Sequence, residues 1–439
     1  MRKFIIFCTA VLFFGCNQKP KEVSINKYLF DEVQTGGVTV IPIETPKGKF
    51  KVWTKYNGDN PKIKVLLLNG GPGATHEYFE CMESFFPAQN IEFIYYDQLG
   101  CGLSDNPNDT SMWDLNRYVD EVDQVRDALH LTSENFYLLG HSWGGILAMQ
   151  YALKYPNNLK GLIISNMMSS IPLYAKYAQD VLAPQFDPKV LDTIRQIEAK
   201  GDFSNPKYME LLTPNFYAKH ICRIPLDKWP EPMTRSFGKM NQSLYVTMQG
   251  PSEFGVGGKL INWDVSKELP KIKVPTLTIG GKYDTMDPEH MKWMSTQVQN
   301  GRYLYCPNGS HMSMYDDQKT YFTGLIQFIK DVAVDWKDSR YLEAEPGDYL
   351  TVARLDKKSD RWFLGAITDE NARDTEIKLD FLTPKKKYKA VLYLDGTNAD
   401  WKENPMSYQI KTIEVTAKST LKLHLAKGGG AAVSFEPVN

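Results

Sequence analysis

The sequence lacks an excess of charge of either sign. Its 439 residues include 51 Lys and Arg against 52 Asp and Glu, which gives a net charge of −1 at pH 7. No sustained basic stripe appears, so the sequence gives no support for a nucleic acid as partner. Hydrophobic residues make up 42% of the chain and aromatic residues 12%, as in ordinary globular proteins. The length allows two or three domains with ample core.

The apolar run near the N-terminus is too short for a membrane span. Phe4–Phe14 falls well below the roughly 20 residues that a transmembrane helix needs. Two basic residues precede this run and Gly15-Cys16 closes it, which is the layout of a secretory signal. A small residue directly before a cysteine resembles a bacterial lipobox. We therefore expect a lipoprotein signal at 1–16 with lipidation of Cys16, and plain secretion is the alternative.

The residues after Cys16 bear on where such an anchor would hold the protein. Residues 17–35 are predicted to form a polar tether that leads into the first strands. Asn17-Gln18-Lys19 lacks the acidic run seen in some surface-exported lipoproteins. The sequence therefore predicts a bacterial cell-envelope protein that is anchored to the membrane by lipid and faces the periplasm.

Cysteines are few, and metal-binding spacings are missing. Neither CxxC nor HExxH occurs, so we expect no metal and no cofactor. The four cysteines beyond the signal allow three complete disulfide pairings in a compartment that permits them. We favour buried free thiols for all four, which are Cys81, Cys101, Cys222 and Cys306.

Apolar segments alternate with helical stretches over 36–335, which predicts an α/β domain. Nearly continuous apolar runs are typical of parallel strands that helices cover on both faces. The alternation stops over 167–262, where many prolines interrupt helices and loops, and we interpret this part as a helical cap. A last helix over 319–334 closes the domain. The expected strands are 64–68, 91–96, 136–139, 159–164 and 276–279.

The chain changes character again over 338–439. Short runs of alternating hydrophobicity are separated there by turn residues, and seven such runs predict an antiparallel β-sandwich. The expected strands are 348–355, 361–368, 375–382, 388–395, 408–416, 420–425 and 431–436.

Gly140-His141-Ser142-Trp143-Gly144-Gly145 joins the expected strand that ends at Leu139 to a helical stretch. A GxSxG pattern between a strand and a helix predicts a nucleophile elbow, with Ser142 at the apex of a sharp turn. The helix N-terminus that follows favours the negative charge that develops during the reaction. Ser142 is therefore the predicted nucleophile.

A serine hydroxyl needs a base, and the base needs a group that orients it. The chain order Ser, acid, His selects Asp284 and His311, which both follow expected strands. His311 would take the proton from Ser142, and Asp284 would hold the imidazole tautomer. Asp287 is the competing acid. The remaining histidines are expected to be structural: His76, His130, His141, His220, His290 and His424.

A glycine-rich turn, Asn69-Gly70-Gly71-Pro72-Gly73, follows the first central strand. Its position predicts a backbone donor for an oxyanion hole, made by the N–H groups of Gly71 and Trp143. Loss of one such donor typically costs about 3 kcal/mol in the transition state.

Several ordered motifs together resemble one enzyme family. They run from about residue 35 to 332 and include Gly70–Gly73, Asp97–Ser104, Gly140–Gly145, Met248–Phe254 and Gly309–His311. They are similar to those of proline iminopeptidases of the α/β-hydrolase fold, of the tricorn-interacting-factor type with a helical cap. The resemblance implies a serine aminopeptidase that releases an N-terminal residue, preferably proline, from short peptides with a free N-terminus.

The resemblance also implies residues that bind the substrate. Glu253 falls on a family position that captures the free ammonium group, and Tyr245 matches a tyrosine that lines the site. Two departures stand out. Related enzymes often carry a second glutamate directly after the catalytic Asp, where this chain has Thr285, and their His-Gly-Gly-Pro-Gly begins here with Asn69. The first departure bears on amine binding and on the preference for proline.

The C-terminal part resembles the β-sandwich of glycoside hydrolase family 97. The likeness lies in Gly347–Arg354, Trp362–Thr368, Leu394–Asp400 and Gly428–Ala432. That family's catalytic barrel is absent from the sequence, so no glycosidase activity is inferred. The resemblance leaves carbohydrate contact open, with Trp362 and Trp401 as stacking candidates, although a core role is expected for Trp362 and bracing or docking for the domain.

Two other functions remain open from the sequence. The same triad could cleave another amide, an ester or a lactone, which the substitution at Thr285 favours. Alternatively, the chain could be a non-catalytic envelope lipoprotein that binds glycans or partners through 338–439.

Overall fold

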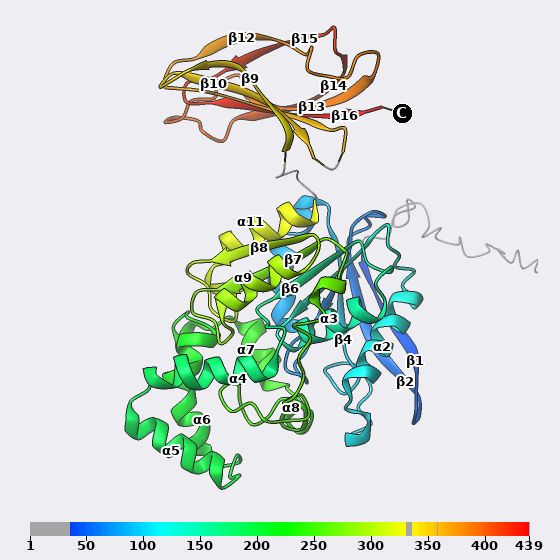
Figure 1. The fold of residues 1–439 in the computed structure, drawn as a ribbon, viewed down its shortest axis with the longest axis vertical. Helices are drawn as coiled ribbons and strands as arrows, with labels where there is room; N and C mark the ends of the chain where they lie inside the picture. Colours follow the sequence, from blue (N-terminus) through cyan, green and yellow to red (C-terminus); the bar gives the residue numbers. More distant parts are fainter. Residues whose placement is uncertain (1–35, 331–335, 358, 439) are drawn as a thin grey trace, which may run out of the picture. The chain divides into compact units, whose positions relative to one another are not determined.

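The structure is a computed structural model that describes residues 36–330, 336–357 and 359–438. The chain divides into two compact units, with the boundary between Lys330 and Asp331 (Figure 1). The predicted signal at 1–16, with Cys16, and the tether at 17–35 lie outside the described residues. Within the described residues, no helix combines the length and apolarity needed to cross a membrane.

The first unit is built on an eight-stranded sheet with the order β1-β2-β4-β3-β5-β6-β7-β8. β1 and β2 form an antiparallel hairpin at one edge, and from β4 to β8 neighbouring strands run parallel. All five strands predicted for this domain are present. The strands are β1 Gly36–Thr45, β2 Gly48–Asn57, β3 Lys64–Leu68, β4 Glu92–Asp97, β5 Phe136–His141, β6 Gly161–Ser165, β7 Thr276–Gly281 and β8 Gly301–Cys306.

Alternating side chains of the central strands pack on opposite faces of the sheet. In β3, Leu66 and Leu68 belong to one apolar core, whereas Val65 and Leu67 belong to another. Helices α2, α3 and α9 cover the first core, and η1, α10 and α11 cover the second. Their bounds are η1 His76–Ser84, η2 Pro87–Gln89, η3 Thr110–Met112, α2 Leu115–Ala128, α3 Trp143–Lys154, η8 Leu269–Lys271, α9 Pro288–Gln297, α10 Ser313–Asp316 and α11 Gln318–Ile329.

The segment between β6 and β7 is helical, as predicted, and its helices gather at one end of the sheet (Figure 1). Prolines begin or interrupt several of these helices, because proline is tolerated in a first helical turn but not in a helix interior. The cap helices are α4 Ile171–Tyr177, η4 Ala178–Leu182, η5 Ala183–Gln185, α5 Pro188–Ala199, α6 Pro206–Leu212, η6 Thr213–Ile221, η7 Leu226–Lys228, α7 Glu231–Gly238 and α8 Gln242–Met248.

The second unit contains a six-stranded antiparallel sheet, in the order β14-β13-β16-β11-β10-β9, and a two-stranded sheet of β12 and β15. One apolar core includes residues of both sheets, which agrees with the predicted sandwich. All seven predicted strands are present. The strands are β9 Trp336–Glu345, β10 Tyr349–Asp356, β11 Trp362–Thr368, β12 Arg373–Lys378, β13 Lys387–Asp395, β14 Tyr408–Thr416, β15 Thr420–Leu425 and β16 Gly430–Pro437.

One strand of this unit was not expected from the sequence. β9 is mostly exposed and carries charged residues without regular alternation, so it has no strand signal of its own. It is recognised only by its antiparallel pairing with β10. Trp362 is a core residue, with 3% of its surface exposed, whereas Trp401 is 52% exposed.

The described cysteines are free thiols, as expected. Cys101, Cys222 and Cys306 are buried and Cys81 is partly buried. Burial raises the pKa of both Cys81 and Cys222 to about 12, so these thiols stay protonated at neutral pH.

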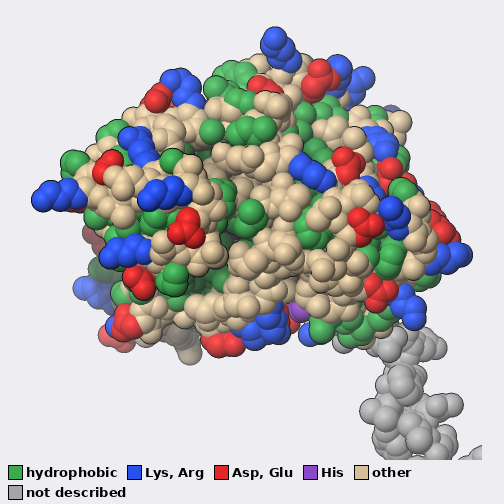
Figure 2. Space-filling view, turned by 90° about the horizontal axis from the view of Figure 1, so that it is seen from below, with side chains coloured by type: hydrophobic (Ala, Val, Ile, Leu, Met, Phe, Trp, Pro, Cys, Tyr) green, Lys and Arg blue, Asp and Glu red, His purple; other side chains and the backbone are tan. Residues whose placement is uncertain are grey.

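Charge is evenly mixed on the face seen in Figure 2. Basic and acidic side chains lie interspersed with hydrophobic ones, and neither sign forms a continuous patch on that face. This agrees with the balanced charge of the sequence.

Candidate active site

Ser142 lies at the sharp turn between β5 and α3. Its backbone has φ 55° and ψ −125°, a conformation that a non-glycine residue adopts only when its surroundings impose it. The turn needs glycine beside it, because a Cβ on Gly144 would lie 2.1 Å from the carbonyl oxygen of Leu68. The strand and the helix therefore meet as the nucleophile-elbow pattern predicts.

His311 and Asp284 form a buried pair. Nδ1 of His311 lies 2.8 Å from Oδ1 of Asp284, and Asp284 is fully buried. The other carboxylate oxygen of Asp284 accepts a hydrogen bond from Nδ2 of Asn166 at 2.7 Å. Burial alone would lower the pKa of His311, but the charge and hydrogen bond of Asp284 outweigh it and raise that pKa above its ordinary value.

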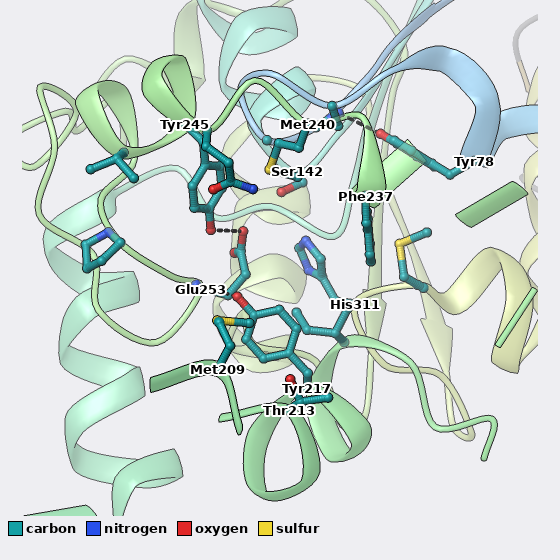
Figure 3. Close-up of a pocket in the computed structure, with 18 of the residues that line it drawn as sticks. Tyr78, Ser142, Met209, Thr213, Tyr217, Phe237, Met240, Tyr245, Glu253 and His311 are labelled. Carbon is teal, nitrogen blue, oxygen red and sulfur yellow. Dashed lines mark hydrogen bonds between the residues drawn. The ribbon is translucent and has the colours of Figure 1, made fainter. Parts of the chain in front are cut away.

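Ser142 and His311 line the same cavity. Figure 3 shows the imidazole of His311 pointing toward Ser142. Among the described residues, no hydrogen bond joins the Ser142 hydroxyl to His311. Such bonds are often long without substrate and tighten when substrate binds.

The glycine-rich turn after β3 borders the same cavity through Gly70 and Gly71. Gly71 has φ +106°, and a Cβ there would lie 2.7 Å from the amide nitrogen of Gly73, so this backbone requires glycine. Asn69 stabilises the turn by donating from Nδ2 to the carbonyl oxygen of Ala74 at 2.6 Å. The side chain of Asn69 therefore contributes to hydrogen bonding within the loop.

The two backbone groups predicted for the oxyanion hole are available. Trp143 is the first residue of α3, so its N–H has no acceptor within the helix. No hydrogen bond from the N–H of Gly71 or Trp143 occurs within the described part of the chain. The indole of Trp143 is held separately, because Nε1 donates to Gln98 Oε1 at 2.9 Å.

His141, expected to be structural, lines the cavity and connects its loops. Burial lowers its pKa to about 3, so the ring is neutral at neutral pH. Nε2 lies 2.9 Å from the carbonyl oxygen of His311 and must donate to it, which leaves Nδ1 to accept from the Tyr78 hydroxyl at 3.2 Å. Tyr78 accepts in turn from the N–H of Gly70 at 2.6 Å (Figure 3).

Glu253 brings a carboxylate into the cavity beside Tyr245 (Figure 3). The hydroxyl of Tyr245 donates to Oε1 of Glu253 at 2.7 Å, and the hydroxyl of Tyr174 lies 3.1 Å from Oε2. No Lys, Arg or Asp side chain is among the described residues that line the cavity, so Glu253 provides the only carboxylate side chain among them. An unpaired carboxylate held by phenols is suited to bind a cation.

Thr285 is not among the described residues that line the cavity and provides no second carboxylate. It is fully buried, and its hydroxyl lies 3.3 Å from His311 Nδ1 and 3.4 Å from Asp284 Oδ1. The alternative acid is also separate from the site, because Asp287 caps α9 by accepting from the N–H of Glu289 at 3.0 Å. Asp284 is therefore the acid that pairs with His311.

The cavity has a volume of about 380 Å³, within the range of small-molecule sites. Its remaining lining is mostly apolar and aromatic.

The chain is similar to known proteins in both units. The alpha/beta hydrolase fold family matches residues 64–318, and the family described as Glycosyl-hydrolase 97 C-terminal, oligomerisation, matches residues 335–436.

Individual relatives match the first unit over nearly their whole length. A proline iminopeptidase of Chitinophaga pinensis is 59% identical over 293 residues, which are 67% of this chain and 98% of that protein. A proline iminopeptidase of Flavobacterium johnsoniae shows the same identity and coverage. The chain belongs to the proline iminopeptidase family. The crystal structure of a Mycobacterium smegmatis proline iminopeptidase agrees, with a TM-score of 0.60, 28% identity, and coverage of 67% of this chain and 98% of that one.

The structure of this proline iminopeptidase family member places Ser142 at a sharp strand-to-helix turn and pairs Asp284 with His311, in agreement with the geometry that the sequence predicts. Tyr78, Tyr174 and Asn166, which position the groups around them, were not predicted from the sequence. Each contacts its partner across at least 63 residues of sequence, and no local motif marks such a contact. The role of His141 could have been suspected because it directly precedes the nucleophile.

Proposed function

We propose that this protein is a serine aminopeptidase that releases an N-terminal residue, preferably proline, from short peptides through an acyl-enzyme on Ser142. One observation carries the proposal. A single cavity is lined by Ser142, by His311 with its partner Asp284, and by the carboxylate of Glu253. A nucleophile, a base and a receptor for an ammonium group are thereby combined at one place.

In the acylation step, Nε2 of His311 takes the proton of the Ser142 hydroxyl as Oγ attacks the scissile carbonyl carbon. The oxyanion that forms accepts hydrogen bonds from the N–H groups of Gly71 and Trp143. When the C–N bond breaks, the imidazolium gives its proton to the leaving amine. Asp284 stabilises the imidazolium during the interval, consistent with the raised pKa of His311.

Deacylation repeats these steps with water. His311 takes a proton from a water molecule that attacks the ester carbonyl, and the same N–H groups stabilise the second oxyanion. Ser142 Oγ leaves as the imidazolium returns the proton, and the free amino acid is released.

Glu253 sets the position of the substrate in this scheme. The charged N-terminus and the scissile carbonyl belong to the same residue and are separated only by its Cα, so a fixed carboxylate selects the first peptide bond for cleavage. A secondary ammonium such as that of proline has two N–H groups, and Glu253 offers two carboxylate oxygens. Thr285 has no carboxylate, and Glu253 is the only acidic residue among the described residues that line the cavity, so one carboxylate carries the whole charge interaction.

The single carboxylate also supports a second candidate, hydrolysis of another amide or ester by the same Ser142. One assay separates the two. Proline arylamide and N-acetylproline arylamide are offered to the wild-type protein and to Ser142→Ala, which should lose three or more orders of magnitude in kcat. Equal turnover by both proteins contradicts the mechanism, and indifference to acetylation favours the second candidate.

For the second unit we propose association with another copy of the chain. An apolar row crosses the outer face of its six-stranded sheet through the paired positions Ile410, Tyr393, Ala432, Gly365, Val352 and Tyr341. Tyr341 is 69% exposed, and Ile410 and Tyr393 are about half exposed. A contiguous exposed apolar patch on a protein surface often marks an interaction site. The family description of this unit, which includes oligomerisation, supports the same proposal.

Light scattering of the purified chain tests this association. The wild type should have at least the mass of a dimer, and Tyr393→Lys together with Tyr341→Lys should give monomers. Met406→Lys is a matched control, because Met406 is exposed but lies outside the row. A monomeric wild type contradicts the proposal.

We also propose that Cys16 carries a lipid and holds the protein at the bacterial envelope, facing the periplasm. The support is the apolar stretch that ends at Gly15-Cys16. Cells fed an alkyne-labelled fatty acid should label the wild-type protein and leave Cys16→Ala unlabelled. Equal labelling of both would contradict a lipid at this residue.

A further inference from the structure

The cavity extends to both sides of the Ser142–His311 pair. Figure 3 shows Glu253 and Tyr245 on one side of these residues and Phe237 on the other. A peptide whose ammonium group meets Glu253 and whose carbonyl meets Ser142 must continue toward Phe237. That second side is therefore where the leaving part of the substrate lies.

Phe237 on the second side is part of one apolar wall. The wall residues all line the cavity and all pack in the same apolar core: Ile221, Trp229, Phe237, Met240 and Met312. Ile221 and Met312 are buried, whereas the other three are partly buried and keep surface open toward the cavity. The wall therefore offers aromatic and thioether surface to whatever follows the scissile bond.

Hydrogen bonds and ion pairs hold the wall in place. The indole Nε1 of Trp229 donates to the carbonyl oxygen of Ile224 at 2.9 Å. Phe237 lies on α7, which is fixed to η1 by an ion pair between Arg235 and Glu80 at 2.8 Å. A wall that is already ordered loses little conformational freedom when a side chain packs against it.

Charge distinguishes this wall from the opposite side. Glu253 has the only carboxylate side chain among the described cavity-lining residues, and no Lys or Arg is among them. The free carboxylate of a dipeptide would lie next to the apolar wall without a cationic partner, and an ionised group in such a place is unfavourable. An uncharged continuation of the chain avoids this cost.

We infer that this wall is a subsite for the residue after the scissile bond and that it selects bulky apolar side chains there. The inference rests on the proposed aminopeptidase function and names its substrate class. The preferred substrates have a free N-terminal residue, an apolar second residue, and no free carboxylate on that second residue. Tripeptides and longer peptides, or dipeptide amides, meet these conditions.

Five substrates test the inference on the full-length wild-type protein: Pro-Phe-NH2, Pro-Leu-NH2, Pro-Gly-NH2, Pro-Asp-NH2 and the free acid Pro-Phe. Burial of a Phe or Leu side chain should make kcat/KM about ten to a hundred times higher than for Pro-Gly-NH2. Pro-Asp-NH2 and free Pro-Phe should be poorer than Pro-Phe-NH2 by at least tenfold. A ratio near one between Pro-Phe-NH2 and Pro-Gly-NH2 overturns the inference.

Variants then assign the preference to the wall. Trp229→Ala and Phe237→Ala should each reduce the ratio of kcat/KM for Pro-Phe-NH2 over Pro-Gly-NH2 by about fivefold or more. Trp293→Ala is the matched control, because Trp293 is partly exposed on α9 and does not line the cavity. Unchanged ratios in both wall variants would overturn the assignment, and the substrate series on the wild type stands even where a variant does not fold.

The same series separates this inference from the proposed function. If Pro-Gly-NH2 is cleaved by the wild type and not by Ser142→Ala, the aminopeptidase proposal holds whatever the second residue does. If none of the five substrates is cleaved, the aminopeptidase proposal itself fails.

Discussion

The ring of His141 donates a hydrogen bond from Nε2 to the carbonyl oxygen of His311 at 2.9 Å. His141, which directly precedes Ser142, thus positions the loop that carries His311. Through Tyr78, the same ring is connected to the N–H of Gly70, next to the predicted oxyanion donor Gly71. One buried neutral imidazole therefore connects the turn at Ser142, the loop of His311 and the glycine-rich turn at Gly70.

Removal of this connection should slow the reaction more than it weakens substrate binding. Tyr78→Phe leaves the buried N–H of Gly70 without an acceptor, which costs about 1–3 kcal/mol. We expect kcat for proline arylamide to fall about tenfold in Tyr78→Phe and in His141→Gln, with KM within threefold. The double variant should lose less than the two effects combined, because both changes break one network. Fully additive losses would contradict a shared role.

Activity should depend on the protonation of His311. Because Asp284 raises the pKa of His311 above 6.5, kcat/KM should fall as pH decreases through a midpoint above that value. Asp284→Asn removes the charge, so the remaining activity should be about three to four orders of magnitude lower, with its acid midpoint moved to lower pH. Asp287→Asn is the control and should retain the wild-type midpoint. An unmoved midpoint in Asp284→Asn would assign the titration to another group.

Glu253 should act on substrates with a free amine and not on blocked ones. Glu253→Gln keeps the size of the side chain but removes its charge, so kcat/KM for proline arylamide should fall by at least a hundredfold. Tyr245→Phe removes one of the phenols that orient this carboxylate and should cost a smaller factor, about three to tenfold. The residual turnover of N-acetylproline arylamide should be the same in all three proteins. If Glu253→Gln still prefers proline arylamide over N-acetylproline arylamide by the wild-type factor, another residue must bind the amine.

The attachment of α7 should respond to salt. Arg235 pairs with Glu80 at 2.8 Å and with Glu77 at 3.2 Å, and Lys239 also pairs with Glu77. Arg235→Gln should loosen the helix that carries Phe237 and lower kcat/KM for Pro-Phe-NH2 a few-fold. Increasing ionic strength screens these ion pairs, so it should also lower wild-type kcat/KM for Pro-Phe-NH2. The variant lacks the Arg235 pairs and should respond less. Arg195→Gln, on the exposed surface of α5, serves as control and should behave as the wild type does.

The sequence predicted the parts of the site that rest on local patterns. A strand, a GxSxG turn and a helix occur within about twenty residues around Ser142, and glycine spacing makes that turn recognisable. The positions of Asp284 and His311 after strands followed from the order of elements in the chain. The fold of the first unit was predictable for the same reason, since buried parallel strands have a strong hydrophobic signal.

Features that depend on distant partners could not be predicted. His141 and His311 are separated by 170 residues, and nothing near either one indicates their hydrogen bond. β9 forms because β10 offers its edge, although its own side chains are mostly exposed. The direction of Thr285 was also hidden, because its place beside the Asp284–His311 pair follows from packing around a fully buried side chain.

The insertion between β6 and β7 supplies Tyr174, Tyr217, Phe237, Tyr245 and Glu253, whereas the loops that follow sheet strands supply Ser142, Asp284 and His311. Apart from Met312, the residues proposed to choose the substrate are therefore encoded in a different stretch of the gene from those proposed to cleave the bond. Replacement of this one contiguous stretch by that of a relative would exchange the selectivity of the enzyme and keep its nucleophile, so new specificities could arise by recombination at two crossover points.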